Sequence, residues 1–116
     1  MLRLHYHNEK LRWIFQRVTG LQLLLCAGIH IWVFFFILER PLSYGTIHAV
    51  LSHPVWLVFY SVFLFLGIYH GLSGLWTVLT DRNPSNTVKR TLKIILISLG
   101  AIFMVLGEWN LIMLSV

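Results

Sequence analysis

A histidine and a carboxylate, His70 and Asp81, stand eleven residues apart near the end of an apolar stretch long enough to cross a membrane. Eleven residues make about three helical turns, so both side chains would share one helix face, about 16 Å apart. Ionisable side chains at membrane depth are costly and are read as functional by default. A neutral imidazole nitrogen is a common axial ligand of heme iron. The spacing therefore predicts a buried heme ligand at His70, above a polar site at the water boundary.

A second histidine, His30, lies within another apolar stretch, thirteen residues beyond Arg17. The alternative role of His70 is a hydrogen bond to a neighbouring helix, and that of His30 is a packing or hydrogen-bonding histidine. Consecutive membrane helices run in opposite directions, which places His30 in the outer half of the membrane and His70 in the inner half. The two rings could then not share one iron, and each would need its opposite ligand from another chain.

The elements that must position these residues follow from the composition. The 116 residues are 58% hydrophobic and 11% charged, whereas a soluble domain is about 25% charged. Three apolar stretches, at residues 18–38, 55–80 and 94–116, reach the length of about 20 residues that a crossing needs. We therefore expect one all-α integral membrane domain over residues 1–116, with transmembrane helices near residues 12–38, 55–80 and 88–115. The single Cys26 excludes an internal disulfide and a cysteine metal cage.

The charge pattern predicts the orientation. The net charge is +5, but its basic residues alternate between segments instead of forming one patch, which argues against nucleic acid. The first loop has only Arg40, and the C-terminal segment has no basic residue. Such alternation follows the positive-inside rule, so we expect a multi-pass protein of the cytoplasmic (inner) membrane, with its N-terminus in the cytoplasm and its C-terminus outside. The other basic residues that precede the first helix or fill the second loop are Arg3, Lys10, Arg12, Arg17, Arg82, Lys89, Arg90 and Lys93.

Charged residues at the predicted boundaries have two possible roles. Arg17, Asp81 and Arg82 should cluster at the cytoplasmic side, as snorkelling anchors or a salt bridge, or as a hydrogen-bonding rim for a lipophilic substrate with a polar head, such as a quinone. Glu108 lies inside the third stretch. It should pair with a neighbouring helix or snorkel to the outer surface, with a proton relay as the alternative.

The first loop carries its own signals. Residues 43–52 could form a short interfacial helix, and Pro54 suits the first position of the second membrane helix.

Two segments resemble a known family. Residues 13–20, WIFQRVTG, followed by residues 28–30, GIH, resemble the first helix of succinate dehydrogenase and fumarate reductase membrane anchors. Residues 69–81, YHGLSGLWTVLTD, resemble the second helix of the smaller anchor subunit. The three-helix length and the orientation agree with that family, whereas the third helix matches it only in general character.

The resemblance implies a membrane anchor beneath a flavoprotein subunit and an iron–sulfur subunit, completed by a second membrane-anchor chain. By that likeness His70 ligates heme b, and His30 corresponds to a histidine that ligates an outer heme in anchors with two hemes. Arg17 and Asp81 fall at the quinone site, and Arg82 stands where many members carry a quinone-binding tyrosine. The chain itself lacks a nucleotide-binding glycine loop and a cysteine cluster, so we expect no flavin or succinate chemistry and no catalytic residue on it.

Two other functions remain open from the sequence. The chain could be a heme-free structural anchor that docks a soluble partner, or a b-type cytochrome subunit of another dehydrogenase.

Overall fold

The computed structural model describes residues 2–116, with side chains from Asn8 onward, so the side chain of Arg3 lies outside the described residues. Over this range the chain is all-helical, without a strand. Three segments, Asn8–Ile37, Pro54–Thr80 and Asn86–Ser115, are long and apolar enough to span a membrane. The predicted three-helix architecture is confirmed.

The first helix is longer than expected. Helix α1 spans Leu2–Trp32 and continues through one wider π-helical segment, η1, at Val33–Ile37. We expected a start near residue 12, but residues 2–11 include leucine, arginine, glutamate and lysine, which are good helix formers. The helix therefore extends beyond the apolar stretch. Leu38 then adopts an extended conformation, which ends the segment where the sequence predicted.

The connections are defined by capping residues. Helix α2, Tyr44–Leu51, begins with a capping box in which Ser43 and Thr46 exchange side-chain to backbone hydrogen bonds. Helix α3, Pro54–Thr80, starts on Pro54 as predicted, and helix α4, Asn86–Ser115, starts after the N-cap Ser85.

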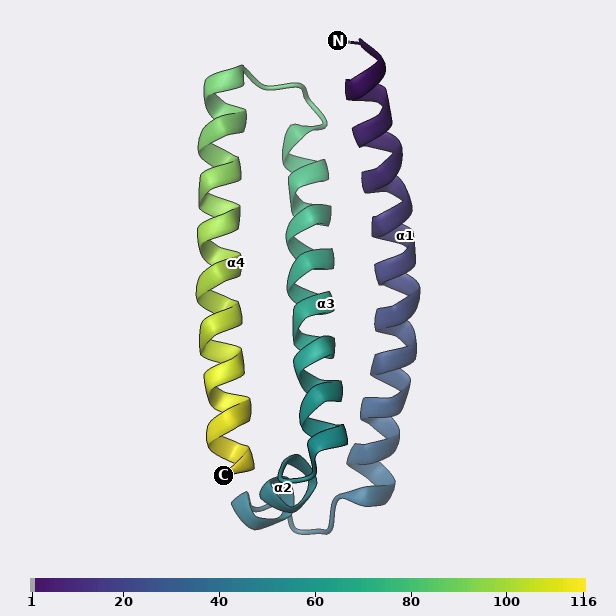
Figure 1. The fold of residues 1–116 in the computed structure, drawn as a ribbon, viewed down its shortest axis with the longest axis vertical. Helices are drawn as coiled ribbons and strands as arrows, with labels where there is room; N and C mark the ends of the chain where they lie inside the picture. Colours follow the sequence, from purple (N-terminus) through teal and green to yellow (C-terminus); the bar gives the residue numbers. More distant parts are fainter. Residues whose placement is uncertain (1) are drawn as a thin grey trace.

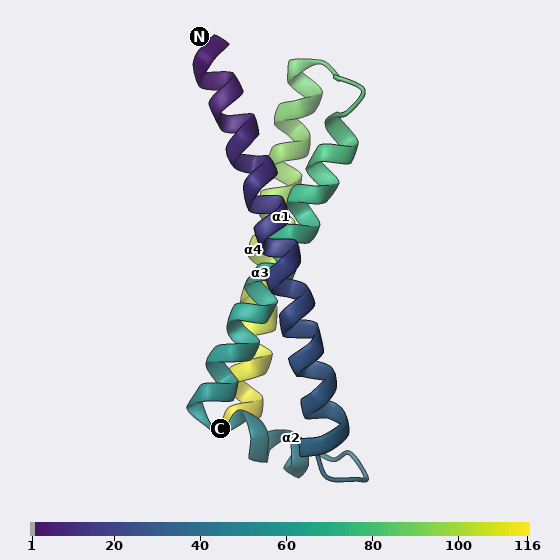
Figure 2. The same cartoon turned by 90° about the vertical axis from the view of Figure 1, so that its right-hand side faces the viewer.

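Helix α3 lies between α1 and α4 and packs against both, while α2 packs across one end of the bundle (Figure 1). The start of α1 and the α3–α4 loop lie at one end, which we call the basic end. The C-terminus and α2 lie at the opposite end. Figure 2 shows that α1 crosses α3 near mid-length and leans away from it toward the basic end.

Glycines set the close contacts between the helices. A Cβ atom on Gly107 of α4 would lie 2.5 Å from Leu64 of α3, and one on Gly100 would lie 2.7 Å from Leu72. Small residues at such positions let membrane helices approach closely. Few described side chains are buried within the chain itself, because most of its apolar surface faces outward, as expected of a membrane bundle. The buried residues are Thr19, Val33, Leu51 and Leu96.

Candidate cofactor and substrate sites

The ring of His70 packs against α1. A Cβ atom on Gly20 would lie 3.1 Å from His70 Cε1, so glycine leaves room for the imidazole. His70 Nδ1 lies 3.1 Å from the hydroxyl oxygen of Thr19, which is buried with 6% of its surface exposed. The alternative role of His70, a hydrogen bond to a neighbouring helix, is thus present at one of its two nitrogens.

The hydrogen bonds of Thr19 fix the tautomer of His70. A threonine hydroxyl has one hydrogen, and Thr19 donates it to the backbone oxygen of Phe15 at 2.7 Å. The Thr19 oxygen must therefore accept from an Nδ1–H group of His70. Within the described side chains no group hydrogen-bonds to His70 Nε2. The ring thus presents a bare nitrogen lone pair, which is the form that ligates a metal.

His30 lies at a separate level of the bundle. Its Nδ1 is 3.1 Å from the hydroxyl oxygen of Tyr60 on α3, and the two rings meet edge to face at 5.6 Å. Two contacts define the register between α1 and α3. Gly20 of α1 lies opposite His70 of α3, and His30 of α1 lies opposite Tyr60 of α3. Ten residues of helix separate these levels by about 15 Å. The two histidines therefore cannot ligate one iron, as the sequence indicated.

Neither histidine belongs to a larger ligand cluster. Among the described residues, no three histidine, cysteine, aspartate or glutamate side chains gather at a distance that would hold a metal ion. A heme iron needs only axial ligands from the protein, so a lone imidazole with a bare nitrogen fits that group, whereas a bare metal ion would need more ligands.

A groove of about 1000 Å³ opens among α1, α3 and α4 in the half of the bundle nearer the basic end. Its walls are mainly aromatic and aliphatic, with a few polar side chains. The polar and aromatic residues are Glu9, Arg12, Trp13, Gln16, Phe65, Tyr69, Ser73, Trp76, Thr77 and Lys93. Neither His70 nor His30 lines this groove.

Gln16 bridges α1 and α3 at the groove and was not predicted as a site residue from the sequence. Its Nε2 donates to the backbone oxygen of His70 at 3.2 Å, and its Oε1 accepts a hydrogen bond from Ser73. A Cβ atom on Gly74 would lie 3.0 Å from Gln16 Nε2. The only available signal was the position of Gln16 beside Arg17 in an apolar context.

The predicted rim residues lie outside the groove lining. Arg17, Asp81 and Arg82 are exposed. The guanidinium of Arg17 lies 4.0 Å from the ring centroid of Trp13. No ion pair joins Arg17 to Asp81 in the described part of the chain. The ends of α1 and α3 diverge toward the basic end (Figure 2).

Glu108 on α4 pairs with a residue of the neighbouring helix α3, which is one of the roles expected for it. Ser61 on α3 donates to Glu108 Oε2 at 2.9 Å, whereas Glu108 Oε1 is buried and has no hydrogen-bond partner among the described residues. The pair ties α4 to α3 near the level of His30.

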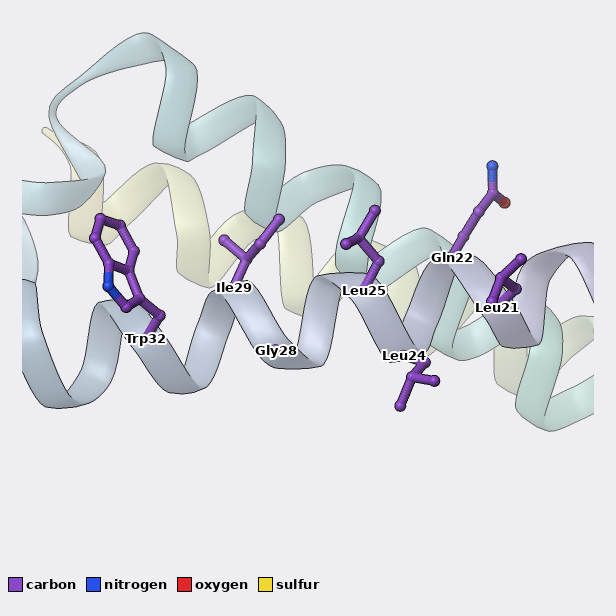
Figure 3. A pocket seen from close by; sticks show the side chains of 7 residues that line it. All are labelled: Leu21, Gln22, Leu24, Leu25, Gly28, Ile29 and Trp32. Atoms are coloured by element: carbon purple, nitrogen blue, oxygen red, sulfur yellow. The ribbon is translucent and has the colours of Figure 1, made fainter.

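A second hollow, of about 670 Å³, lies on α1 alone. Figure 3 shows Leu24, Leu25 and Trp32 around Gly28, with Gln22 farther along the helix. No other helix contributes to it, so it is a feature of the outer surface of α1.

Known proteins resemble this chain in sequence. Residues 2–107 match the family described as the succinate dehydrogenase/fumarate reductase transmembrane subunit. The chain is 32% identical over 93 residues to a succinate dehydrogenase hydrophobic membrane anchor subunit of Thermoplasma acidophilum, covering 79% of this chain and 76% of that protein. It is 31% identical over 83 residues to the protein of the same description from Coxiella burnetii, covering 70% and 69%. The chain therefore belongs to the family of succinate dehydrogenase/fumarate reductase membrane-anchor subunits.

Proposed function

We propose that this chain is the heme-binding anchor subunit of a succinate–quinone oxidoreductase and that it forms part of the quinone site. The observation that carries the heme assignment is the bare Nε2 of His70, held by the Thr19 hydrogen bond in the tautomer that ligates iron. An unpartnered imidazole nitrogen at membrane depth is costly, and a metal bond removes that cost.

His30 is the second candidate ligand. It is exposed on α1, and its Nδ1 is engaged by Tyr60, so a heme held there would also need the surface of a second chain. When bound, heme b supplies a one-electron carrier within the membrane. The residues of this chain orient the imidazole, and Gly20 keeps the space that the ring occupies.

The groove near the basic end is the proposed quinone site. Its aromatic walls suit a flat ring, and its aliphatic walls suit the tail of the molecule. By the positive-inside rule the basic end faces the cytoplasm, where an iron–sulfur subunit and a flavoprotein subunit would dock and a second anchor chain would complete the bundle. Arg17, Asp81 and Arg82 lie outside the groove lining and would form the charged, water-exposed boundary of that site.

The test of the heme assignment is His70→Ala in the purified complex. We expect the reduced-minus-oxidised b-type absorption band to be lost or strongly reduced, whereas His48→Ala, in the α2 segment, should leave it intact. A wild-type complex without a b-type band would instead establish a heme-free anchor. Identification of the soluble chains that copurify separates a succinate dehydrogenase from a cytochrome subunit of another dehydrogenase.

A further inference from the structure

The groove has one polar side chain whose orientation is fixed from both sides. The backbone oxygen of His70 can only accept a hydrogen bond, so the atom of Gln16 that lies 3.2 Å from it must be the amide nitrogen. Ser73 then donates to the amide oxygen of Gln16. Rotating the carboxamide would place the Gln16 amide oxygen against the His70 backbone oxygen, and two acceptors repel each other.

This orientation leaves one donor available. The amide nitrogen of glutamine carries two hydrogens, and the bond to His70 uses one of them. No hydrogen bond uses the other within the described side chains. A Cβ atom at position 74 would lie 3.0 Å from this nitrogen, so Gly74 keeps the space around it open. Gln16 is half-buried and lines the groove.

We propose that Gln16 donates this remaining hydrogen to a carbonyl oxygen of the quinone and that Ser73 positions Gln16 for that contact. The inference rests on the proposed quinone site and adds the residue that would hold the headgroup. A quinone carbonyl accepts but cannot donate, which matches a lone N–H donor. Trp13 and Trp76 offer flat aromatic surfaces in the same groove.

The charged residues of the groove are less suited to this contact. Arg12 and Lys93 line it farther toward the basic end and are exposed. A headgroup bound to them would place its apolar ring closer to water, whereas Gln16 lies one helical turn deeper than Arg12. The same carboxamide touches the backbone of His70, so a quinone bound at Gln16 lies beside the residue proposed to ligate heme.

The experiment uses the assembled complex with decylubiquinone as the probe. Kd is measured by equilibrium dialysis without succinate, and KM and kcat are measured with succinate. In Gln16→Leu we expect Kd and KM to rise about tenfold, the effect of losing one hydrogen bond to a bound ligand, with a much smaller change in kcat and an intact b-type band. Gln22→Leu is the matched control, because Gln22 is exposed on the same helix but lines only the other hollow (Figure 3).

A second variant guards against misassembly. Gln16→Glu keeps the shape of the side chain and the acceptor for Ser73 but removes the amide donor, so it should raise Kd and KM in the same direction. An unchanged Kd and KM in either assembled variant, with a wild-type complex that binds the probe, would overturn the role of Gln16 and leave the quinone site standing. A wild-type complex that neither binds nor reduces decylubiquinone or its naphthoquinone counterpart would overturn the proposed function itself.

Discussion

Substituting Gly20 with alanine should move the His70 ring while leaving the stability of the complex nearly unchanged. The added methyl carbon would lie 3.1 Å from His70 Cε1, whereas ordinary contacts begin at 3.4 Å, so the ring must retreat by a few tenths of an ångström. The bond from His70 Nδ1 to Thr19 is already 3.1 Å long, near the upper end of the range for such bonds. The retreat therefore weakens or breaks it.

The two contributions to stability have opposite signs. Losing the bond to Thr19 costs about 1 kcal/mol, and alanine in place of glycine in a helix gains about 1 kcal/mol. The expected result is a melting temperature close to that of the wild type, together with reduced heme content or a shifted b-type band.

The assay compares the absorption spectrum, the heme content and the melting temperature of the purified complex. Gly28→Ala is the control on the same helix, because a Cβ atom there meets nothing within 4 Å. It should keep the wild-type spectrum and gain up to about 1 kcal/mol. If Gly20→Ala has the wild-type spectrum and heme content, then the packing of His70 on Gly20 does not position a heme ligand.

Two further predictions concern the contact between α3 and α4. In Gly107→Ala the new methyl would lie 2.5 Å from Leu64, and overpacking of about 1–3 kcal/mol should exceed the gain in helix propensity and lower the melting temperature, unless Leu64→Ala is added to make room. In Ser61→Ala the second oxygen of Glu108 also loses its partner, which should cost about 1–3 kcal/mol in thermal melts of the detergent-solubilised complex. Adding Glu108→Leu to Ser61→Ala should restore most of the loss, because no buried polar atom is then left unpaired; a double variant no more stable than Ser61→Ala would contradict this account.

The three membrane helices could be predicted from the sequence because a crossing segment must be apolar over its whole length. The short helix after Ser43 and the start of α3 at Pro54 could also be predicted from the sequence, because turn and cap residues act on the backbone next to them. The start of α1 at Leu2 was not predicted. Residues 2–11 form a helix well, but they are too polar to be recognised as part of a membrane span.

The residues of the candidate site could also be predicted only in part. The cost of an imidazole in hydrocarbon marked His70 and His30 from the sequence, and the length of helix between them placed the two rings at different depths. The partners of these rings, Thr19 and Tyr60, come from another helix. No local pattern predicts them, because the pairing depends on the register between α1 and α3.

The sequence by itself determined the number of membrane helices and the polar residues that lipid makes costly, because both depend on hydrophobicity along one segment. Its residue motifs in the first two helices indicated the family. Only the tertiary structure decided which nitrogen of His70 is bare, that Gln16 faces the groove while Arg17 does not, and that Glu108 pairs with Ser61. These features depend on how the helices cross and on the rotation of each about its axis, and side-chain contacts between helices set both.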